Sequence, residues 1–245
     1  MPPTSCMTKS EESDPTNSGV VFITAGVTYT RDACDAARSV RDTNPTLQID
    51  LFCDVPSSVP DGVFDQIHLI ERPHRRSKVD CLPLSRFERT LYLDSDIRVV
   101  NDLISMFGLL DRFDFAAAHA HARNRSQTNA VWRHEIPDAF PQLNGGVLLF
   151  RKCDKVHQLL KHWAQSFSDA GFAKDQVTLR ELVWLSDLRL FILTPEYNIR
   201  YPKYLKFWDK DEAQPKILHF KDFNSGGDES TLKKTRSSFL KLFRL

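Results

Sequence analysis

The sequence has few of the features that mark secreted, membrane-spanning or nucleic-acid-binding chains. It contains 5 cysteines in 245 residues and no CxxC pair, which favours reduced thiols over a disulfide framework or a zinc site. No apolar run approaches the roughly 18 residues that cross a bilayer. Lys and Arg number 33 against 32 Asp and Glu, so a net charge of +1 provides no overall field for binding nucleic acid. We therefore expect a cytoplasmic protein without a nucleic-acid partner.

The two ends of the chain differ in composition from its middle. Residues 1–18 are rich in Ser, Thr, Pro and Glu and have no hydrophobic segment, which predicts a disordered tail and no secretory signal. Residues 229–245 are basic with apolar positions at helical spacing, which predicts an amphipathic helix. This helix could pack on the domain or make a peripheral contact with a membrane surface or an acidic partner. Residues 19–228 are expected to form a single domain.

The first part of this domain reads as alternating strands and helices. Residues 19–25 and 47–55 are apolar runs rich in β-branched residues, typical of buried strands, and 64–70 predicts a third, short strand. Between them, 26–30 predicts a turn and 32–41 a helix with small apolar residues on one face. Short joints in a strand–helix–strand order predict a right-handed parallel unit. The fold class is therefore α/β, with a Rossmann-like, mostly parallel central sheet flanked by helices.

The pattern continues after a polar interruption. Residues 121–141 are rich in Arg and His and predict a long irregular loop, either functional or disordered. Further strands and helices are expected on both sides of it, at 89–93, 102–110 (helix), 113–118, 143–150, 155–167 (helix), 175–184 (helix), 188–193 and 216–220.

Two carboxylates directly follow the strand predicted at 89–93. Asp94 and Asp96 flank Ser95, and residues spaced i, i+2 in an extended chain point to the same side. Paired carboxylate oxygens suit Mg²⁺ or Mn²⁺, which in proteins often also hold a substrate phosphate. The alternative is an ordinary Asp-rich turn after a strand.

Other polar residues are predicted at the same edge of the sheet, because ligands of open parallel sheets bind at the carboxyl ends of strands. The first strand ends at Thr24-Ala25-Gly26, where Gly26 would let a nucleotide approach the backbone and Tyr29 offers a flat face for a base. His219 could complete a metal site with the two Asp, or it could be a buried core histidine. Lys221 would lie on the same side of its strand and could neutralise a phosphate.

Three further segments carry candidate polar groups. Asn144-Gly145-Gly146 opens a strand, where it is either a tight turn or a point of backbone access for a substrate hydroxyl. Asp175 and Gln176 open a helix, so Asp175 could be a helix cap or could face the reacting centre. The pair His119 and His121 is expected to be an unoccupied polar edge.

Several of these segments, taken in order, resemble the GT-A nucleotide-sugar glycosyltransferases, close to family 8, the glycogenin-like group. The matching pieces lie between residues 19 and 222 and are VVFITAGVTY, SKVDCLPLSRFERTLYLDSDIRVV, FPQLNGGVLLFRK, KDQVTLRELVW, ILTPEYNIRYP and KILHFKDF. The chain departs from the family pattern after His219, where Lys221 follows two residues later in place of Gly and then Lys-Pro-Trp. The resemblance implies a single GT-A domain and a hexosyltransferase activity.

The resemblance also implies roles for particular residues. Asp94, Asp96 and His219 would bind Mn²⁺ or Mg²⁺, and Asn144, Asp175 and Gln176 would line the sugar and the reacting carbon. The donor, expected to be a UDP-sugar, would be contacted by Thr24, Ala25, Gly26, Tyr29, Lys78, Asp94, Ser95, Asp96, Gly145 and Lys221. The acceptor would be a glycan, a lipid-linked molecule or a protein.

The stereochemistry and three other classes of protein remain as alternatives. Retention of configuration, with Gln176 at the reacting face, is favoured over inversion with Asp175 as the base. A haloacid-dehalogenase-type phosphatase also uses Asp-Xaa-Asp, but after the first strand of its domain, whereas here at least three strands are predicted before the strand that leads into Asp94. A nucleotidyltransferase would have a Gly-rich, basic first loop, which GVTYTR matches poorly. A non-catalytic nucleotide-sugar-binding module would keep the same residues without turnover.

Overall fold

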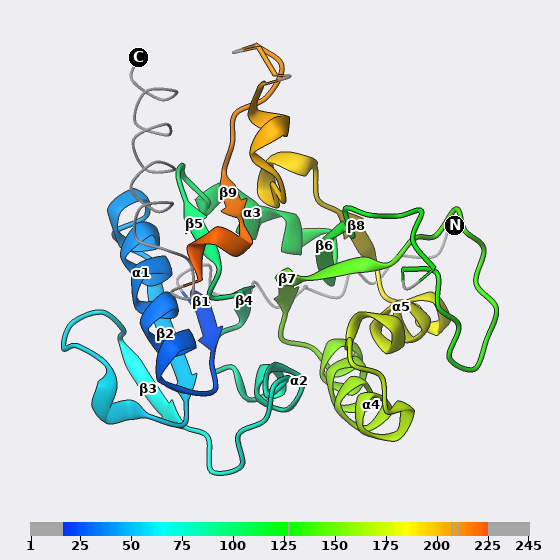
Figure 1. Cartoon of the computed structure of the whole chain (residues 1–245), viewed down its shortest axis with the longest axis horizontal. Coiled ribbons are helices and arrows are strands. Elements are labelled where there is room, and N and C mark those ends of the chain that lie inside the picture. Colours follow the sequence, from blue (N-terminus) through cyan, green and yellow to red (C-terminus); the bar gives the residue numbers. More distant parts are fainter. Residues whose placement is uncertain (1–16, 127, 207, 210, 225–245) are drawn as a thin grey trace, which may run out of the picture.

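A computed structural model describes residues 17–126, 128–206, 208–209 and 211–224 of the chain. Its centre is a seven-stranded sheet with the strand order β3-β2-β1-β4-β7-β6-β8 (Figure 1). Strand β7 is antiparallel to its neighbours β4 and β6, and the other neighbouring pairs are parallel. The strands span β1 Ser18–Ile23, β2 Gln48–Cys53, β3 Gln66–Leu69, β4 Arg89–Leu93, β6 Phe115–His119, β7 Leu143–Arg151 and β8 Leu190–Ile192. The predicted α/β class with a mostly parallel central sheet is confirmed.

Helices cover both faces of this sheet, and alternate residues of β1 enter two different cores. Val20 and Phe22 belong to a core with α1, β5 and α3, whereas Val21 belongs to a second core with α2, α4 and α5. A strand buried on both faces explains why the sequence shows a continuous apolar run instead of alternation. The helices span α1 Val27–Thr43, α2 Lys78–Cys81, α3 Ile104–Phe107, α4 Asp154–Ala170 and α5 Gln176–Leu185.

A second, two-stranded sheet stands beside the large one. Strands β5 (Ile97–Val99) and β9 (Ile217–His219) are antiparallel, with Ile97 opposite His219. This pairing between distant segments places the end of β9 next to the turn that follows β4.

The first helix starts earlier than the sequence analysis predicted. The expected turn at 26–30 is wrong, because Val27 to Thr30 already form the first turn of α1. Gly26 has a φ of 91°, which a residue with a side chain rarely adopts, and this sharp bend lets the helix begin at once. The amide of Thr30 donates to the Gly26 carbonyl at 3.1 Å and closes that turn.

Other predictions concern segments at the limits of the structure. Strand β1 begins at Ser18, one residue before the expected domain boundary. The predicted disordered tail falls almost entirely on residues 1–16, and the predicted basic helix at 229–245, with its membrane or partner contact, also lies outside the described residues. The predicted irregular loop is present, since the described residues between β6 and β7 form neither helix nor strand. Within the described part of the chain, no helix combines the length and apolar character needed to cross a membrane.

Candidate functional site

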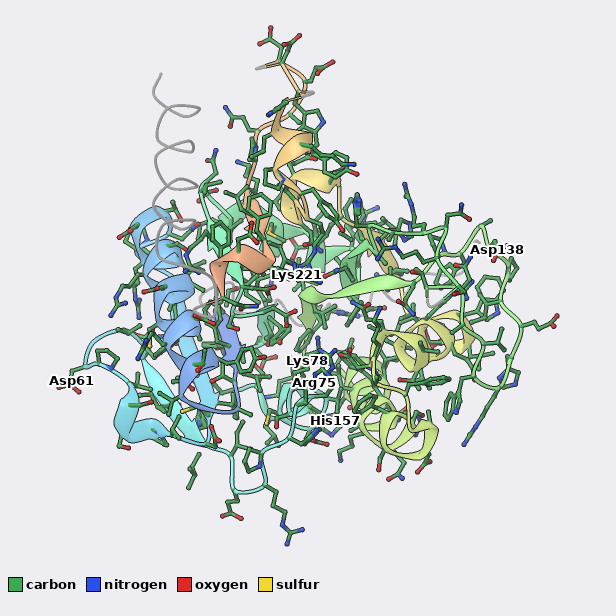
Figure 2. The ribbon with its side chains drawn as sticks, in the orientation of Figure 1. Asp61, Arg75, Lys78, Asp138, His157 and Lys221 are labelled. Carbon is green, nitrogen blue, oxygen red and sulfur yellow. The ribbon has the colours of Figure 1, made fainter. Side chains whose placement is uncertain are left out.

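A cavity of about 490 Å³ lies along the edge where β1, β4 and β6 end and the antiparallel β7 begins. All sequence-predicted site residues except Gly26 and Gly145 line it, namely Thr24, Ala25, Tyr29, Lys78, Asp94, Ser95, Asp96, Asn144, Asp175, Gln176, His219 and Lys221. Figure 2 shows two of them, Lys78 and Lys221, near the centre of the molecule. The fold therefore gathers in one place residues that are scattered through the sequence.

The two carboxylates after β4 converge on His219. The Nε2 atom of His219 lies 2.9 Å from Asp96 Oδ1 and 3.7 Å from Asp94 Oδ2. One potential ligand atom from each residue lies within 4.8 Å of the others. The β5–β9 pairing explains the approach, because His219 sits opposite Ile97, the residue after Asp96. Two oxygen ligands and one imidazole form a set that could hold a divalent cation.

The surroundings of His219 favour a cation at this point. Its Nδ1 lies 2.8 Å from the amide oxygen of Asn198, and both side chains are buried. An Nδ1–H that donates to Asn198 leaves the lone pair of Nε2 directed at the Asp96 carboxylate. A lone pair and an anion at this distance repel each other unless a proton or a metal ion lies between them. The residues present therefore fit a bound divalent ion.

The charge state of Asp96 is consistent with that fit. Burial opposes ionisation, but a His219 ring that carries a proton on Nε2 and the charge of Arg200 hold the pKa of this carboxyl below its usual value, and a bound ion would take the place of that proton. Asp96 is therefore an anion at neutral pH and available as a ligand.

Asp94 is oriented by Tyr92, which sequence reasoning missed, and Gly146 leaves room for it. Tyr92 precedes it by two positions, and its hydroxyl donates to Asp94 Oδ1 at 2.5 Å. Burial and the nearby carboxylate of Asp94 raise the pKa of Tyr92 well above its usual value, so the hydroxyl keeps its proton. A Cβ at Gly146 would collide with the His219 ring and lie 2.5 Å from Asp94 Oδ2. The i, i−2 position of Tyr92 relative to Asp94 was the available signal.

Lys78 forms the centre of a buried network next to Asp94. Its Nζ donates to the Gly145 carbonyl at 2.7 Å and lies 3.0 Å from Asp175 Oδ2 and 3.6 Å from Asp94 Oδ1. Only 5% of Lys78 and 2% of Asp175 are exposed. Burial favours the neutral amine, but Asp175 and Asp94 outweigh it and raise the pKa of Lys78. A fixed positive charge therefore lies beside the candidate metal ligands.

The side chain of Asp175 does not cap α5, which was one of its two predicted roles. It faces Lys78 instead, and its backbone carbonyl accepts hydrogen bonds from Trp163 Nε1 and Thr178 Oγ1. Gln176, the first residue of α5, lines the cavity beside Asp175. Both residues therefore line the cavity, and their role at a reacting centre stays a prediction.

Asn144 stabilises the start of β7 instead of only turning the chain. Its Oδ1 accepts the amide of Gly146 at 2.9 Å, and it is 9% exposed where it meets the cavity. This bond fixes the backbone that also receives Lys78.

The first turn is rigid and presents one aromatic ring. Thr24 and Thr30 share a hydrogen bond between their hydroxyls at 2.9 Å, and Asp54 Oδ1 accepts the amide of Gly26 at 2.7 Å. Tyr29, at the start of α1, is 53% exposed and lines the cavity. Asp54 is a further contributor that the sequence analysis did not single out.

Basic residues at the rim of the cavity were also missed. Arg75 and Arg76 come from the loop before α2, and Arg200 follows Asn198 by two residues. Lys221 lies in the short 3₁₀ helix Lys221–Phe223 and not in the expected strand, which ends at His219. It nevertheless lines the same cavity as His219. The pair His119 and His121 is not part of the Asp94–Asp96–His219 cluster.

Comparisons with known proteins give fold matches but no sequence-family match. No family model matches the chain, and no curated protein matches its sequence. An active-site mutant structure of LgtC matches with a TM-score of 0.58 at 16% identity, over 89% of this chain and 95% of LgtC. The galactosyltransferase LgtC in complex with donor and acceptor sugar analogues matches with a TM-score of 0.56 at 15% identity, over the same shares of the two chains.

A third structure has the same fold in a longer chain. The glycosyltransferase GlyE of Streptococcus pneumoniae matches with a TM-score of 0.54 at 22% identity. The match covers 82% of this chain but only 54% of GlyE, so the chain spans about half of the GlyE length. These likenesses show that the chain has the GT-A, Rossmann-like fold of LgtC in a single domain.

Proposed function

We propose that this protein is a metal-dependent glycosyltransferase that moves a sugar from a nucleotide-diphosphate donor to an acceptor hydroxyl. The observation that carries the proposal is the convergence of Asp94, Asp96 and His219 beside the buried Lys78–Asp175 pair, at the ligand-binding edge of a GT-A fold. A diphosphate needs both a divalent cation and fixed positive charge, and this edge has ligands suited to such a cation and the charge of Lys78.

Side chains of known charge would hold the donor. Lys78 supplies a buried ammonium, while Lys221 and Arg200, which line the same cavity, would neutralise the outer oxygens of the diphosphate. At the other end, the exposed ring of Tyr29 offers a stacking face for the nucleotide base, which we propose to be uracil. Gly26 leaves space close to the backbone beside that ring.

Asp94, Asp96 and His219 would hold the metal, which we propose to be Mn²⁺ because it accepts mixed oxygen and nitrogen ligands better than Mg²⁺ does. Asn198 fixes the histidine tautomer, and Tyr92 orients Asp94. When bound, the ion supplies a Lewis acid that offsets the charge developing on the leaving diphosphate.

The reaction consists of one bond exchange and one proton transfer. The acceptor oxygen forms a bond to the anomeric carbon, the bond from that carbon to the diphosphate breaks, and the hydroxyl proton passes to the departing diphosphate. Asp175 is engaged by the Lys78 ammonium at 3.0 Å, which makes it poorly suited to act as a free base. This engagement supports retention, with Gln176 at the reacting face, over inversion with Asp175 as the base.

Variants of the carboxylate pair test the proposal. Asp94→Asn or Asp96→Asn should lower Mn²⁺-dependent release of nucleoside diphosphate by about 100-fold or more, since each removes a charged ligand. The assay would screen nucleotide-sugars with the purified protein, and circular dichroism would verify the fold of each variant. The matched control is Asp138→Asn, which should keep full activity. Asp138 is exposed and lies at one end of the molecule (Figure 2).

The same assay separates the rival functions. A binding module would show Mn²⁺-dependent donor binding without release of nucleoside diphosphate. Full activity in both single variants would contradict the assignment of the site.

A further inference from the structure

A group of basic and aromatic side chains lies beside the candidate site and, apart from Arg200, has no role in the proposed chemistry. We call it the basic platform, and it consists of His121, Arg123, Arg200, Tyr201, Lys203 and Tyr204. It is formed by the loop after β6 and by the segment that leads from Asn198 into the 3₁₀ helix Pro202–Lys206. Two segments far apart in the sequence thus build one surface.

The platform lies on the opposite flank of the site from the first turn. In the sheet, β4 has β1 on one side and β7, followed by β6, on the other. His119, the last residue of β6, pairs with Leu143 at the start of β7, and His121 follows it by two residues. Arg200 connects the platform to the site, because it lines the same cavity as Asp96 and its charge helps to lower the pKa of that residue. The platform is therefore on the side away from Tyr29, where the nucleotide base is proposed to bind.

The aromatic rings of the platform are fixed in position by one another. The ring centroid of His121 is 4.4 Å from that of Tyr201 and 5.0 Å from that of Tyr204. The Tyr204 hydroxyl lies 3.0 Å from His121 Nε2. Tyr201 remains 41% exposed, so part of its ring is available to a ligand. An ordered aromatic face of this kind suits the apolar face of a sugar ring.

The cations of the platform have no carboxylate partner at ion-pairing distance in the described part of the chain. Arg123 and Lys203 are exposed and Arg200 is half-buried. The Nζ of Lys203 lies 5.8 Å from the ring of Tyr201 and 5.5 Å from that of Tyr204, so charge and aromatic face are adjacent. Several uncompensated positive charges around a concave site attract anionic ligands.

The charges of the platform also act on His121. Burial, then the charges of Lys203, Arg123 and Arg200, lower its pKa below the usual value. The imidazole is therefore neutral at pH 7 and remains available for stacking and hydrogen bonding.

We infer that the acceptor is an anionic saccharide, whose sugar ring stacks on Tyr201 while its negative group binds Arg123 and Lys203. The negative group can be a carboxylate, as in a uronic acid, or a phosphate, and the chemistry of recognition is the same. This inference rests on the proposed function, because it names the class of molecule that receives the sugar.

Ligand-observed saturation-transfer NMR tests the inference without needing a donor. The probes are glucuronate, glucose 6-phosphate and the uncharged methyl glucoside, which share a ring and differ in charge. We expect saturation of the two anionic probes at least about fivefold above that of methyl glucoside, decreasing between 50 and 300 mM salt by roughly half or more because salt screens exposed charges. Preference for one anionic probe over the other identifies the carboxylate or the phosphate as the group recognised.

A double variant links the signal to the platform. Arg123→Gln with Lys203→Gln should reduce saturation of the anionic probes by about tenfold, as expected for loss of charged hydrogen bonds. The control, Arg112→Gln with Lys161→Gln, removes the same two charges at exposed positions and should leave saturation unchanged. Arg112 precedes β6 at the end opposite to His121, and Lys161 lies on the outer side of α4.

Two outcomes would overturn the inference. One is equal saturation of methyl glucoside and the anionic probes, and the other is an unchanged signal in a platform variant that keeps its melting temperature. Neither bears on donor turnover, which the release of nucleoside diphosphate measures separately. Failure of the acceptor class and failure of the proposed function are therefore distinguishable.

Discussion

At the scale of single residues, Lys78 and Asp175 have to be considered together. Both are almost fully buried, and their charged atoms are 3.0 Å apart. A buried ion pair gains little net stability over apolar residues of the same size, yet loss of one partner leaves an uncompensated charge. The pair is therefore costly to break and is explained better by function than by stability.

This reasoning gives a prediction for Lys78→Met. The free energy of unfolding should fall by about 3 kcal/mol, because Asp175 loses its main counter-charge. Urea denaturation of the wild type and the variant at pH 7 measures this change in the free energy of unfolding. Lys152→Met is the matched control, since Lys152 is exposed and 3.8 Å from Glu88, and its loss should cost less than about 1 kcal/mol.

A second change completes that test. Adding Asp175→Leu to Lys78→Met should restore part of the lost stability, because no charge remains buried without a partner. Equal stability of the single and double variants would show that the pair does not act as a unit. Donor turnover should be lost in both, since both lack the ammonium beside Asp94.

At the scale of secondary-structure elements, one carboxylate joins three strands at the far end of the sheet. Asp114, just before β6, accepts hydrogen bonds from Arg151 Nε at 2.7 Å and from the amide of Arg189 at 2.9 Å. Arg151 ends β7, and Arg189 precedes the edge strand β8. This contact therefore ties the short β8 to the rest of the sheet.

Asp114→Asn should lower the stability of the protein by about 1–2 kcal/mol at pH 7, the range for a charged hydrogen bond with partly exposed partners. Burial opposes ionisation of Asp114, but hydrogen bonds from Arg189 and Arg151 outweigh it and lower its pKa. A lowered pKa stabilises the fold fully above the unfolded-state value of about 4, and the effect is lost as pH falls toward the folded-state pKa.

The pH dependence of the stability difference between the wild type and Asp114→Asn tests whether the charge of Asp114 is responsible. Urea denaturation should be carried out on both proteins at pH 7, 5 and 3. The difference between their free energies of unfolding should stay constant between pH 7 and 5 and become smaller at pH 3. A gap that is the same at all three values would mean that the charge of Asp114 is not responsible.

The loop between β6 and β7 shows how an element predicted as irregular is nevertheless ordered. Glu181 of α5 accepts the amides of Arg133 and His134 at 2.9 and 3.0 Å. Arg180 donates to three carbonyls of the same loop, those of Ile136, Pro137 and Phe140. The helix that begins beside the site with Gln176 thus also holds the loop. Polar composition predicted the loop, but it could not show which helix fixes it.

At the scale of the whole molecule, the candidate metal site joins the two sheets. Asp94 and Asp96 belong to the turn between β4 and β5, and His219 ends β9. An ion bound by all three would stabilise the folded state by mass action, because the unfolded chain does not hold them together.

Mn²⁺ at 100 times its dissociation constant should therefore add about 2.7 kcal/mol, and raise the melting temperature by roughly 5–10 °C for a chain of this size. Differential scanning calorimetry with Mn²⁺ and with EDTA measures the shift. It should vanish in Asp96→Asn and persist in Asp138→Asn. An equal rise in the melting temperature of both variants would mean that the ion binds at another site.

The sequence alone determined the class of fold and most of the residues that line the site. Apolar runs without alternation indicated strands buried on both faces, and the i, i+2 spacing of Asp94 and Asp96 placed two carboxylates on one side of the chain. These are local properties, because they depend on backbone geometry over a few residues.

Only the tertiary structure decided how distant segments meet. The antiparallel direction of β7 brings Gly146 to the same edge as Asp94, and the pairing of β5 with β9 brings His219 to Asp96. The partners Tyr92 and Asn198 and the basic platform likewise became visible only in three dimensions. Strand neighbours depend on burying two faces of a whole sheet at once, and no short stretch of sequence contains that information.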